Sequence, residues 1–118
     1  MKKLLVISPH PDDEVLGAGG ILIKAKKNGY KTKVLTISTN FPEPIIKKRL
    51  DSSLKEASQA HKILKVDQSV FFNIPTLTLS KQNVPELTAR IFNEISNFSP
   101  DIVLIPFPDR HQDHKIVF

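Results

Sequence analysis

The sequence predicts an α/β protein with a Rossmann-like, three-layer fold, in which helices cover both faces of a mostly parallel sheet. Two observations favour this class. Short continuous apolar runs, typical of strands buried on both faces, alternate with longer segments whose apolar residues recur every three or four positions. The 118 residues, 40% hydrophobic and 25% charged, also match one globular domain. Such alternation of strand and helix favours parallel strands joined by right-handed crossovers.

Four strands are predicted from the apolar runs. They cover residues 4–7, 34–37, 69–74 and 102–105. In the doubly wound order 3-2-1-4, the first and fourth strands are neighbours, and ligands bind outside their carboxyl ends. The loops that follow these two strands are therefore expected to meet.

Four helices are predicted from periodic apolar residues. The first covers residues 14–28, the second is long and covers residues 46–64, the third covers residues 85–98, and a short fourth begins near His114. Pro85 fits the first turn of the third helix, because its missing N–H would have no partner there. Each helix is expected to place its apolar face on the sheet.

The composition excludes several functional classes. Without cysteine, the chain has no disulfide scaffold, iron–sulfur cluster or thiol chemistry, so any metal must use His, Asp or Glu. The net charge is +5, but solvated helix faces explain the lysines better than nucleic-acid binding does. No apolar run is long enough for a secretory signal or a membrane span, so we expect a cytoplasmic protein.

Two polar clusters follow the first and fourth predicted strands. They read Pro9-His10-Pro11-Asp12-Asp13-Glu14 and Arg110-His111-Gln112-Asp113-His114. Asp12 and Asp13 would repel each other unless a cation, a proton or helix N-terminal amides compensate. A divalent metal held by one histidine and one carboxylate of the first loop and a histidine of the second would do so, and another carboxylate could act as a base. Helix capping by Asp12, Asp13 or Asp113 is the alternative, but it leaves the histidines unexplained.

At these residues the sequence resembles the LmbE-like (PIG-L) family of metal-dependent N-deacetylases, whose signature is an (A/P)HPDD(E) loop and a later HxDH. The two motifs stand here at residues 9–14 and 111–114, and the similarity extends through residues 17–20, 56–64 and 100–103. The resemblance implies a hydrolase that removes an acetyl group from an N-acetylglucosamine-type amide by attack of a zinc-bound water. Its substrate would be a small amino-sugar conjugate.

The resemblance also implies a role for each motif residue. Zn²⁺, or another divalent ion, would be bound by His10, Asp13 and His114. The general base would be Asp12, while His111 would stabilise or protonate the tetrahedral intermediate and Asp113 would orient a histidine.

Three features depart from the family pattern. Ser53 stands where an arginine is usual, Lys65 stands where a helix-ending glycine is common, and family members continue well past HxDH. We therefore interpret residues 1–118 as the N-terminal part of a single deacetylase domain that is truncated at its C-terminus. Residues 102–105 would then form an open edge of the sheet, and the sequence leaves the formation of homo-oligomers open.

Three other interpretations compete with this one. A dinucleotide-binding module would need glycines in the first turn, whereas Gly17, Gly19 and Gly20 follow three acids, where packing of the helix on the sheet explains them better. A receiver domain would need an aspartate at the end of the third strand, which reads Phe72-Asn73-Ile74. The third alternative is a catalytically inactive fragment that only binds metal or a partner.

Two residues outside the motifs carry simpler expectations. His61 lies beside the apolar stripe of the second helix and is expected to be a packing or surface residue rather than a metal ligand. Phe107 follows the fourth strand and is expected to be buried in the core.

Overall fold

The computed structural model describes residues 1–39, 46–75 and 78–118. Its sheet contains four strands: β1 (Lys3–Ser8), β2 (Lys31–Thr39), β3 (Gln68–Pro75) and β4 (Ile102–Leu104). They lie in the order β3-β2-β1-β4, and every neighbouring pair is parallel. The predicted order 3-2-1-4 is confirmed, and the described sheet is wholly rather than mostly parallel.

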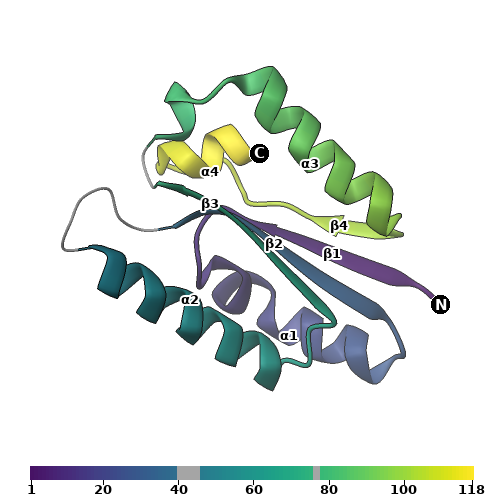
Figure 1. The fold of residues 1–118 in the computed structure, drawn as a ribbon. Helices are drawn as coiled ribbons and strands as arrows, with labels where there is room; N and C mark the ends of the chain where they lie inside the picture. Colours follow the sequence, from purple (N-terminus) through teal and green to yellow (C-terminus); the bar gives the residue numbers. More distant parts are fainter. Residues whose placement is uncertain (40–45, 76–77) are drawn as a thin grey trace.

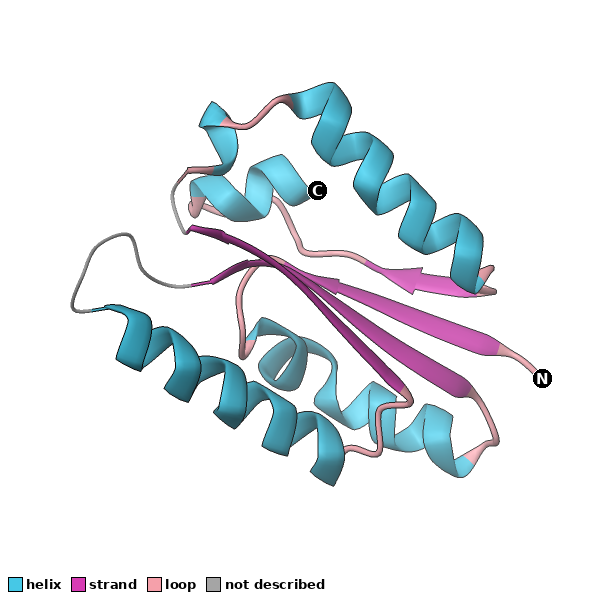
Figure 2. Ribbon diagram, viewed as in Figure 1, coloured by secondary structure: helices cyan, strands magenta, loops and turns pink. Residues whose placement is uncertain are grey.

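Helices cover both faces of the sheet, as the sequence predicts. The helices are α1 (Asp13–Lys27), α2 (Ile46–Ile63), α3 (Val84–Phe98) and α4 (Gln112–Val117), with a short 3₁₀ helix η1 (Leu79–Lys81). Helices α1 and α2 lie on one face, and α3 and α4 lie on the other (Figures 1 and 2). The sequence did not predict η1, because three residues are too few to show a helical period. None of the helices in these ranges is long and apolar enough to span a membrane.

The strands separate two hydrophobic cores. Leu5 and Ile7 of β1 belong to a core that α3 and α4 cover, whereas Leu4 and Val6 belong to a core that α1 covers. Successive side chains of a strand point to opposite faces, so a strand between two helical layers must be apolar at every position. This explains why β1 is a continuous apolar run.

Strand β4 brings the end of the sequence beside its beginning. Its three residues pair with β1 from Leu4↔Ile102 to Val6↔Leu104, so the chain leaves both strands at the same edge of the sheet. Within the described ranges no strand pairs with the other side of β4, and Ile102 and Val103 are exposed. The expected open edge is therefore present.

Two packing predictions are wrong. A Cβ atom at Gly17 or Gly20 would meet no atom within 4 Å, and one at Gly19 would lie 3.9 Å from Val15 Cγ1, so close packing does not require these glycines. Phe107 is 79% exposed, because it follows the edge strand and no described element covers it.

Candidate active site

The loop between β1 and α1 is held firmly against β2. The carbonyl oxygen of Pro9 accepts two hydrogen bonds from Ser38, one from its backbone N–H and one from its hydroxyl, each at 2.8 Å. Asp12 then adopts a φ of 101°, a conformation that costs about 1–3 kcal/mol for a residue with a side chain. Its carbonyl accepts the first bonds of α1, but its carboxylate makes no capping bond. The capping alternative therefore does not account for Asp12.

The loop after β4 is organised by a histidine. His111 precedes α4, and its Nδ1 accepts the backbone N–H of Asp113 at 3.1 Å. The capping alternative does not hold for Asp113, because His111 is the residue that caps α4. Since Nδ1 is an acceptor, the neutral ring of His111 carries its proton on Nε2. Asp113 is instead fully buried, with a relative exposure of 0%.

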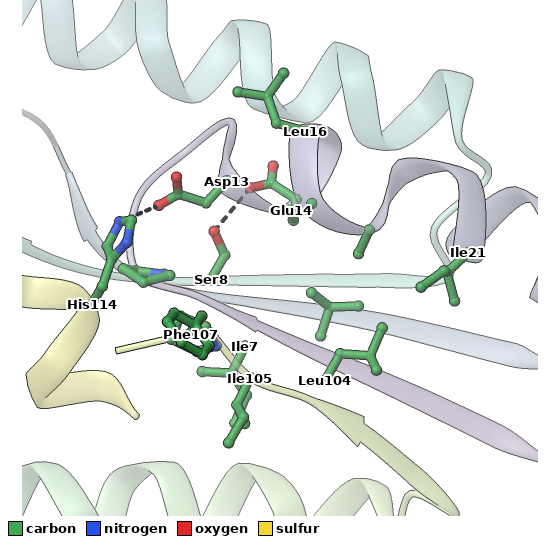
Figure 3. A pocket seen from close by; sticks show the side chains of 15 residues that line it. Ile7, Ser8, Asp13, Glu14, Leu16, Ile21, Leu104, Ile105, Phe107 and His114 are labelled. Atoms are coloured by element: carbon green, nitrogen blue, oxygen red, sulfur yellow. Dashed lines mark hydrogen bonds and ion pairs between the residues drawn. The ribbon is translucent and has the colours of Figure 1, made fainter. Parts of the chain in front are cut away.

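Histidines and carboxylates from the two loops converge. Asp13 Oδ2 lies 3.4 Å from His10 Nδ1 and 3.2 Å from His114 Nε2. The close-up in Figure 3 shows the Asp13 and His114 side chains pointing toward each other. The ring centroid of His111 lies 4.6 Å from that of His10 and 4.8 Å from that of His114. The parallel pairing of β1 and β4 therefore brings together residues about a hundred positions apart.

Both His10 and His114 also contact a second carboxylate through the other ring nitrogen. His10 Nε2 lies 2.8 Å from Asp113 Oδ2, and His114 Nδ1 lies 2.9 Å from Asp109 Oδ2. Such contacts fix the tautomer and orientation of metal-binding histidines in proteins, because the outer carboxylate leaves the inner nitrogen free to bind. His10 Nδ1 and His114 Nε2 are the nitrogens that face Asp13.

Two of the distances between these atoms match those expected between ligands of a tetrahedral metal. Two ligand bonds of about 2.0–2.1 Å at a tetrahedral angle place their ligand atoms roughly 3.3 Å apart. Both distances from Asp13 Oδ2 to the histidine nitrogens are close to this value. The three histidines His10, His111 and His114 also offer ligand atoms within 4.8 Å of one another. The donor set is nitrogen and oxygen only, which suits zinc and related divalent ions.

The electrostatics of the cluster follow from its partners. Burial opposes ionisation of Asp13, but His10 and His114 outweigh it and lower the pKa of that carboxyl. Burial likewise opposes protonation of His10, but Asp13 and Asp113 outweigh it and raise its pKa. Asp12 differs, because burial together with the charges of Asp13 and Glu14 raises its pKa. The pKa values of the neighbouring Asp12 and Asp13 are thus shifted in opposite directions.

A pocket of about 530 Å³ opens beside the cluster. Asp13 and His114 lie at its polar end, and apolar side chains of α1 and of the β4 segment line the rest, among them Leu16, Ile21, Leu104 and Phe107 (Figure 3). A small ligand can therefore place a polar group against the cluster and an apolar part along α1.

The structure brings all six predicted site residues to one edge of the sheet, and it adds three that the sequence analysis did not assign to the site. Asp109 contacts His114, and the buried side chains of Glu14 and His61 contact each other at 2.8 Å. An acid two residues before HxDH was a signal that could have identified Asp109. No local pattern pairs Glu14 with His61, because they lie 47 residues apart.

Comparison with known families accounts for this arrangement. The model of the GlcNAc-PI de-N-acetylase family (PIG-L) matches residues 5–118. The chain belongs to this family. The predicted resemblance to the PIG-L family is confirmed, and the matched residues include both loops described above. A search of the curated proteins found no match.

Solved structures share the PIG-L fold of this chain. The conserved protein TT1542 from Thermus thermophilus is 31% identical, with a TM-score of 0.80, over 99% of this chain and 52% of that one. The N,N'-diacetylchitobiose deacetylase from Pyrococcus horikoshii is 25% identical, with a TM-score of 0.83, over 98% and 46%. GalB, the 4-carboxy-2-hydroxymuconate hydratase from Pseudomonas putida, is 25% identical, with a TM-score of 0.85, over 99% and 52%. The chain thus spans about half the length of these relatives.

Proposed function

We propose that this chain carries the metal centre and the acid–base residues of an N-deacetylase that hydrolyses the acetamide of a small amino-sugar conjugate. The observation that carries the proposal is the Asp13 carboxylate, which lies at ligand–ligand distance from one histidine of each loop. Membership of the PIG-L family and a diacetylchitobiose deacetylase among the similar structures support the reaction and the substrate class.

His10, Asp13 and His114 would hold the metal, with zinc as the preferred ion for this set. The metal, when bound, would polarise an amide carbonyl and make a water more acidic. Asp113 and Asp109 hold the two histidines with their inner nitrogens toward Asp13, so the donor atoms are oriented before an ion arrives.

Asp12 would accept the proton of the attacking water. Its carboxylate makes no capping bond, and its raised pKa is the direction that brings a carboxylate nearer to the range of an efficient base. His111 would donate its Nε2 proton toward the developing oxyanion, because its Nδ1 is already bonded to the backbone. Asp12 would return the proton to the leaving amine, so that water and amide become acetate and amine.

Metal binding is the first test. The purified chain is expected to bind about one zinc per chain, and the Asp13→Ala, His114→Ala double variant is expected to lose this binding while keeping its fold by circular dichroism. Asp101→Asn is the control, because Asp101 accepts the Lys3 N–H at the opposite end of β4. Zinc that binds equally well to the double variant would contradict the assigned ligands.

Acetate release from N-acetylglucosamine conjugates is the second test. Asp12→Asn is expected to lower kcat by about 10²- to 10⁴-fold at unchanged zinc stoichiometry, the usual contribution of a general base. GalB shows that a hydratase shares this fold, so hydration of an enol or alkene acid should be assayed in parallel. A metal-loaded, folded chain that releases no acetate would refute the deacetylase proposal and favour the alternative of a fragment that binds metal without hydrolysis.

A further inference from the structure

A polar network that includes the buried side chains of Glu14 and His61 contacts the backbone of Asp12. Glu14 is 2% exposed and His61 is 3% exposed, and their side chains meet at 2.8 Å between Oε1 and Nε2. Glu14 belongs to the first turn of α1, whereas His61 lies near the end of α2. The prediction that His61 is a packing or surface residue is therefore incomplete, because this ring is buried in a specific polar contact.

Glu14 uses its other oxygen to hold the loop. Its Oε2 accepts the backbone N–H of Asp12 at 3.1 Å and lies 3.0 Å from the hydroxyl of Ser8, which also contacts the His10 carbonyl at 2.6 Å (Figure 3 draws the contact of Ser8 with Glu14). Ser8 is the last residue of β1, so one carboxylate ties the strand end to the residue that the proposed reaction uses as a base.

His61 in turn is held from the sheet. Its Nδ1 lies 2.7 Å from the Ser69 hydroxyl at the start of β3. The His61 tautomer that donates to the Glu14 carboxylate from Nε2 leaves Nδ1 as an acceptor for the Ser69 hydroxyl. The network therefore connects Ser69 through His61 and Glu14 to the Asp12 N–H.

The conformation of Asp12 explains why such a network is needed. A φ of 101° is unfavourable for aspartate and persists only where the surroundings hold it. Burial of Glu14 is likewise unfavourable without partners, and its two oxygens face three of them. A hydrophobic residue at position 14 would fill the space but would leave the Asp12 N–H without its acceptor.

We propose that Glu14 and His61 are positioning residues, which hold the Asp12 backbone in its positive-φ conformation and so aim its carboxylate toward the proposed ligands His10, Asp13 and His114. The catalytic part of this inference rests on the proposed function, whereas the conformational part does not. Among the described contacts of this network, α2 and β3 reach Asp12 through Glu14.

A matched pair of substitutions at position 61 separates positioning from packing. His61→Gln places an amide nitrogen near the position of Nε2 and keeps a donor for Glu14, whereas His61→Asn places its amide near Nδ1 and keeps only the Ser69 contact. Hydrogen exchange of the Asp12 amide is measured by NMR in the metal-free chain. Ser38 is the internal reference, because its N–H bonds to Pro9 in the same region without using Glu14.

In His61→Asn, the Asp12 amide is expected to exchange about tenfold faster or more, while the Ser38 amide keeps its wild-type rate. In His61→Gln, both amides are expected to stay near wild type. Equal acceleration of both amides in His61→Asn would mean general loosening, and an unchanged Asp12 amide would mean that the network does not hold it. Either result overturns the proposal.

Kinetics of the metal-loaded chain provide the second readout. His61→Asn is expected to lower kcat about tenfold with KM and zinc stoichiometry unchanged, and His61→Gln is expected to restore most of the loss. A loss in KM alone, or equal losses in the two variants, would contradict positioning. If the wild-type chain releases no acetate, the proposed function fails there, and the exchange experiment still decides whether Glu14 and His61 hold Asp12.

Discussion

Asp109 contributes to the candidate site without facing the metal position. Its Oδ1 accepts the backbone N–H of His111 at 2.8 Å, and its Oδ2 lies 2.9 Å from His114 Nδ1. The hydrogen bond from His111 and the contact with His114 lower the pKa of Asp109, so the carboxylate is ionised at neutral pH. One exposed acid therefore shapes the loop and orients a proposed ligand.

Asp109→Asn is expected to weaken zinc binding by about 10- to 100-fold, because the amide is a poorer acceptor and no longer favours the His114 tautomer with a free Nε2. Zinc affinity by competition with a chelator measures this effect, and the thermal midpoint of the metal-free chain should hardly change. Asp101→Asn makes the same chemical change away from the site and should retain full affinity. Equal affinity in wild type and Asp109→Asn would show that Asp109 does not orient His114.

At the scale of elements, the end of α2 places a lysine in a left-handed backbone conformation that favours glycine. Val66 N–H donates to the His61 carbonyl at 2.9 Å and Lys65 N–H donates to the Lys62 carbonyl at 3.1 Å, the bond pair of a Schellman motif. That motif needs a left-handed residue, and Lys65 provides it with a φ of 56°. The glycine that the family often has here would adopt this conformation without strain.

Lys65→Gly is expected to raise the free energy of unfolding by roughly 0.5–1 kcal/mol, since relief of left-handed strain exceeds the entropy that glycine adds to the unfolded chain. Chemical denaturation measures the change. Lys62→Gly, three residues earlier in the last turn of α2, should instead destabilise by up to about 1 kcal/mol, because a helical position disfavours glycine. Destabilisation by both substitutions would contradict the strain at Lys65.

Apolar periodicity in the sequence predicts which elements form, but it does not predict which individual residues are buried. Apolar spacing predicts the strands and the four main helices, because both cores lie against the sheet and select apolar residues at fixed intervals. It does not predict the exposure of Phe107, because burial after an edge strand depends on which element covers it. The expectation for the glycines of α1 fails for a similar reason, since packing partners are not visible in a linear pattern.

At the scale of the whole molecule, Asp67 joins three elements at the end of the sheet opposite the site. Asp67 directly precedes β3. Its carboxylate lies 2.6 Å from Lys26 Nζ at the end of α1 and accepts the Thr32 N–H of β2 at 2.7 Å. Burial raises the pKa of Asp67, but the bonds from Lys26 and Thr32 outweigh it, and the pKa is lowered overall from 3.8.

This shift predicts a pH dependence of folding. Because the folded pKa lies below the unfolded value of 3.8, Asp67 stabilises the fold above that pH, and the contribution disappears as the pH falls through the folded pKa. Asp67→Asn is expected to cost about 1 kcal/mol at neutral pH, a modest value because the ion pair is partly exposed. The difference from wild type should shrink below pH 3.8. Denaturant titrations at neutral pH and below pH 3.8 measure this difference in the free energy of unfolding. Lys26→Met should show part of the same effect. Equal losses of stability in wild type and Asp67→Asn as the pH falls would rule out the contribution of Asp67.

The sequence by itself determined the α/β class, the strand order and the two loops of the site. Apolar periodicity marks the elements, and the motifs at residues 9–14 and 111–114 stand directly after the two strands that parallel topology makes neighbours. Local chemistry and the rules of strand connection were sufficient for this.

Only the tertiary structure decided which side chains face one another. It assigned Asp113 to His10 and Asp109 to His114, and it paired Glu14 with His61 across 47 residues. Hydrogen-bond partners at these distances depend on the twist of the sheet, the exit angles of the loops and the rotamers that packing permits. A linear sequence lists the donors and acceptors, but their pairing is a property of the assembled fold.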